Sequence, residues 1–167
     1  MTLRQVDETS KSVRILVVDD YGPWRDFISN TLKKEPGLEV IGSVSDGSAA
    51  VEQAQQLQPD LILLDISLPI LNGIQAANRI GETSPSSKIL FVSENRSVDV
   101  AERALSTGAR GYVIKSDAVR ELLPAIRAVL EGKRFISASL AGHFLVASTL
   151  VTTQTLSWFV NMISGIG

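Results

Sequence analysis

The 167-residue chain contains no cysteine and a single histidine, His143. Disulfides and thiolate metal centres are therefore excluded, and one histidine without partners does not make a metal site. The lack of cysteine and of a secretory leader favours a cytoplasmic location. The formal net charge of −2 also lacks the excess of Lys and Arg that nucleic-acid binding usually requires.

Charge is missing from the end of the chain. All charged residues lie at or before Arg134, so the segment from Phe135 to Gly167 carries none. This shift in composition predicts three parts: a polar, disordered N-terminus over 1–12, a folded domain over 13–132 and an uncharged tail over 133–167.

The tail also lacks a long hydrophobic run. Polar residues interrupt it repeatedly, with TTQT at 152–155, so we do not expect it to cross a membrane. Apolar residues at helical spacing instead predict helices over 140–163 that bury one face in protein, as in a homodimer. The alternative is a disordered or frameshift-derived tail.

Five short apolar runs rich in β-branched residues alternate with segments whose apolar residues recur at helical spacing. The runs predict strands over 13–18, 38–44, 60–65, 88–93 and 111–115. The longer segments predict helices over 24–34, 47–58, 73–82, 98–107 and 118–131. Asp46 and Asp117 stand where helix N-caps are expected, and Gly73 after Asn72 indicates a turn. Strands that alternate with helices pair in parallel, so we expect a doubly wound α/β domain with a five-stranded parallel sheet.

Polar residues stand at the ends of four predicted strands. Asp19 and Asp20 follow the first, and Asp65, Ser93 and Lys115 end the third, fourth and fifth. In such sheets ligands bind beyond the carboxyl ends of the strands. Carboxylates that meet there repel unless a cation such as Mg²⁺ neutralises them. Because Asp can act as a nucleophile, we expect this edge to accept a phosphoryl group on Asp65.

Four motifs in order, ILVVDD, LILLDISLPILNG, FVS and GYVIKSD, resemble those of the receiver domain of two-component response regulators. Together they span about residues 13–132. GARGYVIKSD followed by EGKRFIS resembles the subfamily in which a helix-turn-helix module follows the receiver. The resemblance implies a flavodoxin-like (βα)5 fold, a sensor histidine kinase as partner and Mg²⁺ as cofactor.

The resemblance also implies a role for each site residue. Asp65 is the expected phosphoacceptor. The expected Mg²⁺ ligands are oxygen atoms of Asp19, Asp20, Asp65 and the main-chain carbonyl of Ser67. Lys115 and Ser93 are expected to contact the phosphoryl group.

Tyr112 matches the aromatic residue that changes rotamer when the hydroxyl residue, here Ser93, moves. Two positions depart from the family pattern. Glu94 stands where many receivers carry a small residue, so it is expected to modulate access or the rate of dephosphorylation. Ser116 stands where many relatives have proline, so no cis bond is expected after Lys115.

Other classes of function fit less well. Phosphatases of the haloacid dehalogenase type need a second Asp two residues after the nucleophile, where this chain has Ser67. Self-phosphorylation with slow hydrolysis is therefore favoured over turnover of external phosphate esters. No G-x-G-x-x-G follows the first strand, which argues against dinucleotide binding. A structural interaction module that is never phosphorylated remains an alternative.

The output of such a switch is not evident from the sequence. A helix-turn-helix module needs Lys and Arg for contacts with DNA phosphates, and none follow Arg134. We therefore expect no direct DNA binding by this chain. It could be a stand-alone receiver or a truncated or frameshifted relative of a DNA-binding regulator.

Overall fold

The computed structural model describes residues 11–144, in which strands and helices alternate along the chain. The first half contains β1 (Val13–Val18), α1 (Gly22–Lys33), β2 (Leu38–Val44), α2 (Gly47–Leu57), β3 (Leu61–Leu64) and α3 (Gly73–Thr83). The second half contains β4 (Lys88–Ser93), α4 (Val98–Leu105), β5 (Gly111–Ile114), the 3-10 turn η1 (Lys115–Asp117), α5 (Ala118–Leu130) and β6 (Phe135–Ile136). A further helical segment, 138–144, follows β6.

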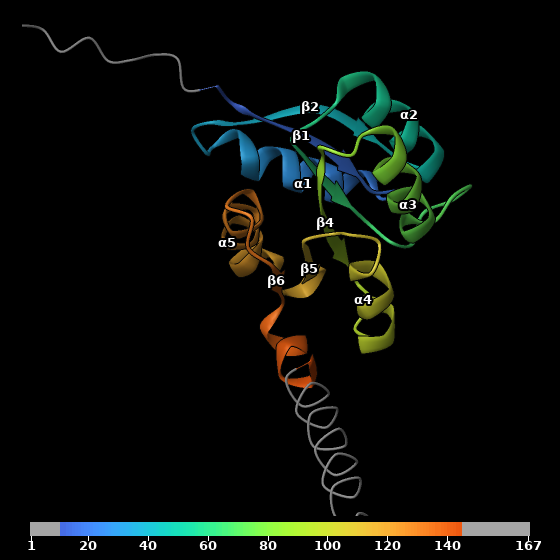
Figure 1. Ribbon diagram of the computed structural model, residues 1–167. Helices are drawn as coiled ribbons and strands as arrows, with labels where there is room; N and C mark the ends of the chain where they lie inside the picture. The colour runs from blue at the N-terminus through green and yellow to red at the C-terminus, as the bar shows by residue number, and fades with distance from the viewer. Residues whose placement is uncertain (1–10, 145–167) are drawn as a thin grey trace, which may run out of the picture.

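The strands form one parallel sheet in the order β2-β1-β3-β4-β5-β6. Helices α2, α3 and α4 cover one face, and α1 and α5 cover the other (Figure 1). The strand order reverses between β1 and β3, so the crevice beyond these two strands is where a doubly wound fold binds ligands. The predicted doubly wound α/β fold is confirmed.

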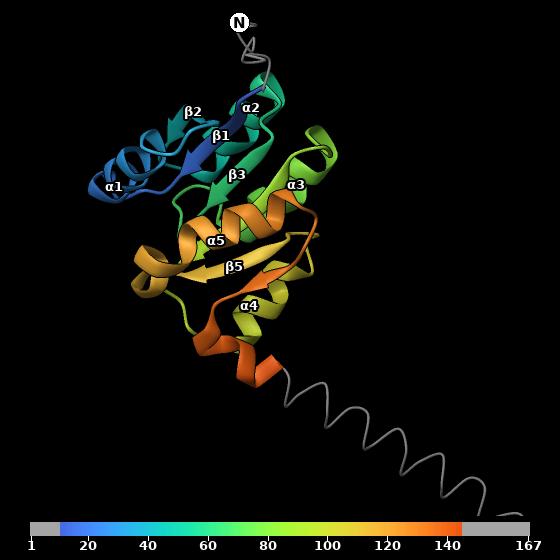
Figure 2. The ribbon, with the colours of Figure 1, turned by 90° about the vertical axis from the view of Figure 1, so that its left-hand side faces the viewer.

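The sheet has six strands within the described residues, so the predicted count of five is wrong. The sixth, Phe135–Ile136, pairs with β5 in the registers Gly111↔Phe135 and Tyr112↔Ile136. It lies in the segment that the lack of charge had assigned to the tail. A two-residue strand is too short for an alternating pattern to reveal, and only the free edge of β5 makes it a strand. The helical segment 138–144 lies beyond this edge of the sheet in both views (Figure 2).

Local sequence explains most helix boundaries. Asp46 caps α2 by accepting a hydrogen bond from the Ala49 N–H at 2.7 Å. Asp117, at the corresponding place before α5, makes no such cap. Its Oδ2 instead accepts a hydrogen bond from the Ser139 hydroxyl at 2.9 Å. The side chain is therefore used for tertiary contact with the segment after β6.

No helix within residues 11–144 is long and apolar enough to cross a membrane. Residues 1–10, which are most of the N-terminus 1–12 expected to be disordered, and 145–167, which include most of the expected tail helices, lie outside the described residues. The part of the tail that is described, 138–144, is helical and buries Leu140 against the face of the sheet that carries α4.

Candidate functional site

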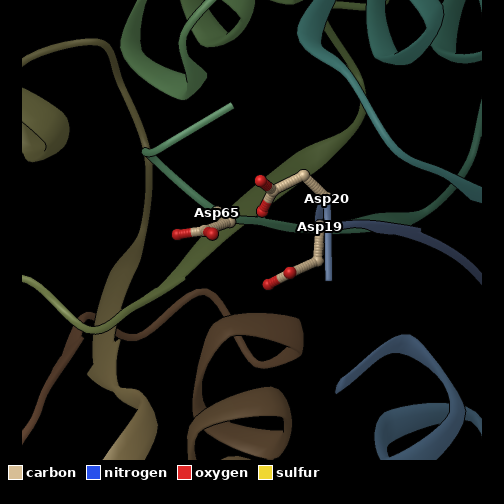
Figure 3. A group of neighbouring side chains, drawn as sticks. All are labelled: Asp19, Asp20 and Asp65. Carbon is tan, nitrogen blue, oxygen red and sulfur yellow. The ribbon is translucent and has the colours of Figure 1, made fainter. Parts of the chain in front are cut away.

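Three carboxylates meet at the carboxyl ends of the two central strands β1 and β3. Asp19, Asp20 and Asp65 each place one carboxylate oxygen within 4.8 Å of the others (Figure 3). Asp19 and Asp20 are consecutive, so their side chains leave the end of β1 on opposite sides. Asp19 and Asp65 are buried, whereas Asp20 is exposed. The parallel fold therefore brings together the carboxylates that the sequence predicted at one edge.

Lys115 joins this cluster from the first residue of η1, directly after β5. Its Nζ lies 2.6 Å from Oδ2 of Asp19 and 3.2 Å from Oδ2 of Asp65. The same ammonium lies 5.2 Å from the centre of the Trp24 ring, which adds a cation–π contact. One partly buried cation thus bridges two buried carboxylates and offsets part of their repulsion.

Asp65 lies in a position that disfavours its charged form. Its pKa is raised from 3.8 to about 6 as the net result of burial, which raises it most, the neighbouring Lys115 ammonium, which lowers it, and the Asp19 carboxylate, which raises it. Its Oδ1 accepts a hydrogen bond from the Ile66 N–H at 2.7 Å. This places one oxygen on the main chain and the other beside Lys115, so the carboxyl group is held in a single orientation.

Asp19 is fixed in a similar way. Its Oδ1 accepts a hydrogen bond from the Tyr21 N–H at 2.9 Å, while Oδ2 pairs with Lys115. Arg25 of α1 donates to the Asp19 main-chain carbonyl at 2.6 Å. The strand end that carries the two Asp residues is therefore tied to the first turn of α1.

Ser93 ends β4 and Tyr112 lies in β5, and both are buried. Both contact the main chain of Asn95. The Ser93 hydroxyl accepts from the Asn95 N–H at 3.2 Å, and the Tyr112 hydroxyl donates to the Asn95 carbonyl at 2.7 Å. The β4–α4 loop and β5 are thus joined through one residue, which sequence patterns do not reveal.

An open pocket of about 540 Å³ lies over the cluster. It is lined by Asp20, Tyr21, Asp65, Ser67, Glu94 and Lys115. Both remaining candidates, Ser67 and Glu94, are therefore at its wall. Five of the six lining residues, all except Lys115, carry a side-chain oxygen, and hard oxygen donors around a solvent-accessible position fit Mg²⁺.

Two features of the site were not recognised in the sequence. Gly73 reads there as a turn residue, but a Cβ atom at this position would collide with the main-chain carbonyl of Asp65. Its N–H donates to the Ile66 carbonyl at 2.8 Å, so the start of α3 lies directly against the site. The described residues contain no cis peptide bond, as expected after Lys115. The Ser116 hydroxyl accepts a hydrogen bond from the Arg96 guanidinium at 2.6 Å, which the sequence did not indicate.

Comparison with known proteins identifies relatives along most of the chain. A family described as the response regulator receiver domain matches residues 15–127. The response regulator GacA of Pseudomonas viridiflava is 32% identical over 136 residues, which are 81% of this chain and 64% of that protein. The nitrate/nitrite response regulator protein NarL of Escherichia coli K12 is 31% identical over 150 residues, 90% of this chain and 69% of that protein.

The chain thus spans less than two thirds of the length of the GacA relatives it matches. Solved structures show the same fold. A two-component response regulator of the LuxR family from Aurantimonas sp. SI85-9A1 superposes with a TM-score of 0.79 at 29% identity, covering 83% of this chain and 99% of that one. The isolated REC domain of RcsB from Salmonella enterica serovar Typhimurium, with a phosphomimetic, superposes with a TM-score of 0.73 at 23% identity, covering 78% of this chain and 97% of that one.

Proposed function

Because this chain belongs to the family of response regulator receiver domains, we propose that it is a signalling switch in which Asp65 accepts a phosphoryl group from a sensor histidine kinase. The observation that carries the proposal is the bridge from Lys115 to Asp65 and Asp19 beneath an open, oxygen-lined pocket. A nucleophilic carboxylate, a charge-neutralising ammonium and a place for a divalent cation are the parts that phosphoryl transfer requires.

The residues suited to hold Mg²⁺ are the carboxylates of Asp19, Asp20 and Asp65, with the Ser67 carbonyl as a main-chain donor. When bound, the ion supplies positive charge for the transferring oxygens. With its pKa near 6, the Asp65 carboxyl group is mostly ionised at neutral pH and so can act as a nucleophile.

In the transfer, a carboxylate oxygen of Asp65 forms a bond to phosphorus while the bond from phosphorus to the donor nitrogen or oxygen breaks. The leaving group keeps that electron pair and takes its proton from solvent. Lys115 moves its contact from the free carboxylate to a phosphoryl oxygen, and the Ser93 hydroxyl donates to another. No side chain of the pocket is required as a general acid, so the reaction is one self-modification per cycle followed by slow hydrolysis.

The switch is proposed to pass through Ser93 and Tyr112. If Ser93 turns its hydroxyl toward the phosphoryl group, it gives up its bond to the Asn95 N–H, and the Tyr112 ring changes rotamer with the loop. The proposed result is altered pairing in a homodimer. Glu94, at the pocket wall, is proposed to slow access of donors and of hydrolytic water. A cytoplasmic location and an output without direct DNA binding remain predictions from the sequence.

The test is phosphorylation of the purified full chain by acetyl phosphate with Mg²⁺, read by intact-protein mass spectrometry. Wild type should gain one phosphoryl group, and Asp65→Asn should gain none. Asp26→Asn, an exposed change on α1, is the matched control and should behave as wild type. Equal labelling of Asp65→Asn and wild type would show that Asp65 is not the acceptor.

A further inference from the structure

Ser137 is a buried polar residue that the proposed reaction does not use. It is 0% exposed and lies between β6 and the helical segment 138–144. A buried hydroxyl is costly unless it is hydrogen-bonded, so its partners indicate what holds it there.

The main-chain N–H, the main-chain carbonyl and the side-chain hydroxyl of Ser137 all have hydrogen-bond partners. Its N–H donates to the Tyr112 carbonyl of β5 at 2.9 Å, which continues the ladder between β6 and β5. Its carbonyl accepts from the N–H groups of Leu140 and Ala141 at 2.9 and 3.0 Å, which begins the following helix. The Ser137 carbonyl is therefore used by the following helix, and the side-chain hydroxyl accepts the hydrogen bond from the next free N–H of β5.

The Ser137 hydroxyl closes a ring of contacts around the turn that carries Lys115. Its Oγ accepts from the Ile114 N–H at 2.8 Å, the last residue before η1. It donates to Oε2 of Glu121 at 2.5 Å, in the first turn of α5 after η1. The other oxygen of Glu121 accepts from the Ala138 N–H at 3.0 Å. One side chain thus ties the element before η1 to the element after it.

We propose that Ser137 is a positioning residue for Lys115: by holding both ends of η1, it directs the Lys115 ammonium at Asp65 and couples the site to the segment after α5. This inference rests on the proposed function. Without the hydroxyl, the Ile114 N–H and the Glu121 carboxylate lose a buried partner, and the turn is free to relax. Coupling is reciprocal, so a phosphoryl group held by Lys115 must also stabilise the docking of residues 137–144.

The first measurement does not depend on phosphorylation. Lys115 has only 10% of its side chain exposed in its ion pairs, so it should react slowly with an acylating reagent, as read by peptide mass spectrometry. Ser137→Ala and Glu121→Gln should raise that reactivity several-fold. Ser137→Thr, which keeps the hydroxyl, should react as slowly as wild type. Ser84→Ala is the matched control, because Ser84 is equally buried and bonded to Gln58 and Ser87 in the loop before β4.

The second measurement is binding of beryllofluoride with Mg²⁺, a phosphoryl mimic, compared with binding of Mg²⁺ alone. Ser137→Ala should weaken beryllofluoride binding on the order of tenfold, the value of one charge-assisted contact, and should not weaken the binding of Mg²⁺ alone. In a Lys115→Met background the same substitution should have no further effect, because the two residues act as one unit. Amide exchange at Ser137 and Leu140 should slow in wild type when beryllofluoride binds.

Two results would overturn the inference. One is folded Ser137→Ala and Glu121→Gln proteins whose Lys115 reactivity matches that of Ser84→Ala. The other is an equal loss of beryllofluoride affinity from Ser137→Ala with and without Lys115. A wild-type chain that binds no beryllofluoride would instead count against the proposed function, and the reactivity of Lys115 would still decide the role of Ser137.

Discussion

The Lys115 ammonium lies 2.6 Å from Oδ2 of Asp19, closer than its 3.2 Å approach to Asp65. The cation therefore pairs with two of the three carboxylates that are candidate ligands of a divalent metal. Lys115 and Mg²⁺ each offset the repulsion among the carboxylates with positive charge. Each should therefore weaken the binding of the other at this carboxylate cluster.

We expect Lys115→Met to bind Mg²⁺ several-fold more tightly than wild type while phosphorylation by acetyl phosphate falls steeply. The substitution removes the cation that competes for Asp19 and also the partner of the phosphoryl oxygens. Tryptophan fluorescence or calorimetry measures the affinity. Lys88→Met is the control, because Lys88 donates to the Leu130 carbonyl, outside the acidic cluster, and should leave Mg²⁺ affinity unchanged. Weaker Mg²⁺ binding by Lys115→Met would contradict the competition.

Asp65 should make the metal-free protein less stable as the pH rises. Its pKa is raised from 3.8 to about 6 on folding, so between these values the folded state binds more protons than the unfolded state. The stability that this raised pKa contributes is fully present below pH 3.8 and is lost as the pH rises through 6. We expect Asp65→Asn to be more stable than wild type at pH 7.5 by on the order of 2 kcal/mol, with no difference near pH 4. Thermal denaturation in EDTA across this range is the measurement, and a gap of constant size would contradict it.

Metal binding should stabilise the fold. A ligand that binds only the folded state adds stability by mass action, about 2.7 kcal/mol at a hundred times its Kd. We expect the melting temperature of metal-free wild type to rise with millimolar Mg²⁺, and that of the double variant Asp19→Asn, Asp20→Asn to stay constant. Differential scanning fluorimetry after chelation is sufficient. A melting temperature of wild type that does not change with Mg²⁺ would contradict the magnesium site.

Ile70 is a candidate for stabilisation. It lies between β3 and α3 with a φ of 69°, and its side chain is 83% exposed. A β-branched residue in this left-handed region costs roughly 1–2 kcal/mol, and little packing compensates here. We expect Ile70→Asn to stabilise the protein by about 1 kcal/mol in denaturant unfolding. Val119→Asn, an equally exposed change at ordinary helical φ, should give no such gain.

Removal of β6 should destabilise the domain. A chain that ends at Gly132 leaves the β5 edge, Glu121 and the surface under Leu140 without partners, at a cost of at least about 2 kcal/mol. A chain that ends at Phe144 keeps these contacts and should unfold at a higher denaturant concentration than the chain that ends at Gly132. Equal stability of the two shortened chains would contradict this. Light scattering of the full chain against the Phe144 version, with and without beryllofluoride, separately tests the proposed dimer.

Local patterns in the sequence determine much of this molecule. Apolar runs locate β1 to β5 to within one residue at each end, and Asp46 identifies the start of α2. These signals work because a strand or helix cap depends on residues only a few positions apart. The parallel order of the strands then brings Asp19, Asp20, Asp65 and Lys115 to one edge, so the candidate site follows from the order of the motifs alone.

The tertiary structure decided what depends on distant partners. Phe135 and Ile136 form a strand because β5 offers a free edge, and Asp117 turns from its expected cap to Ser139, 22 residues away. Gly73 is required by the backbone of Asp65 rather than by its own turn. Ser137 bonds to Ile114, 23 residues earlier, and an isolated serine in an uncharged segment carries no mark of that partner. Such pairings are set by the three-dimensional packing of whole elements, which no short window of sequence contains.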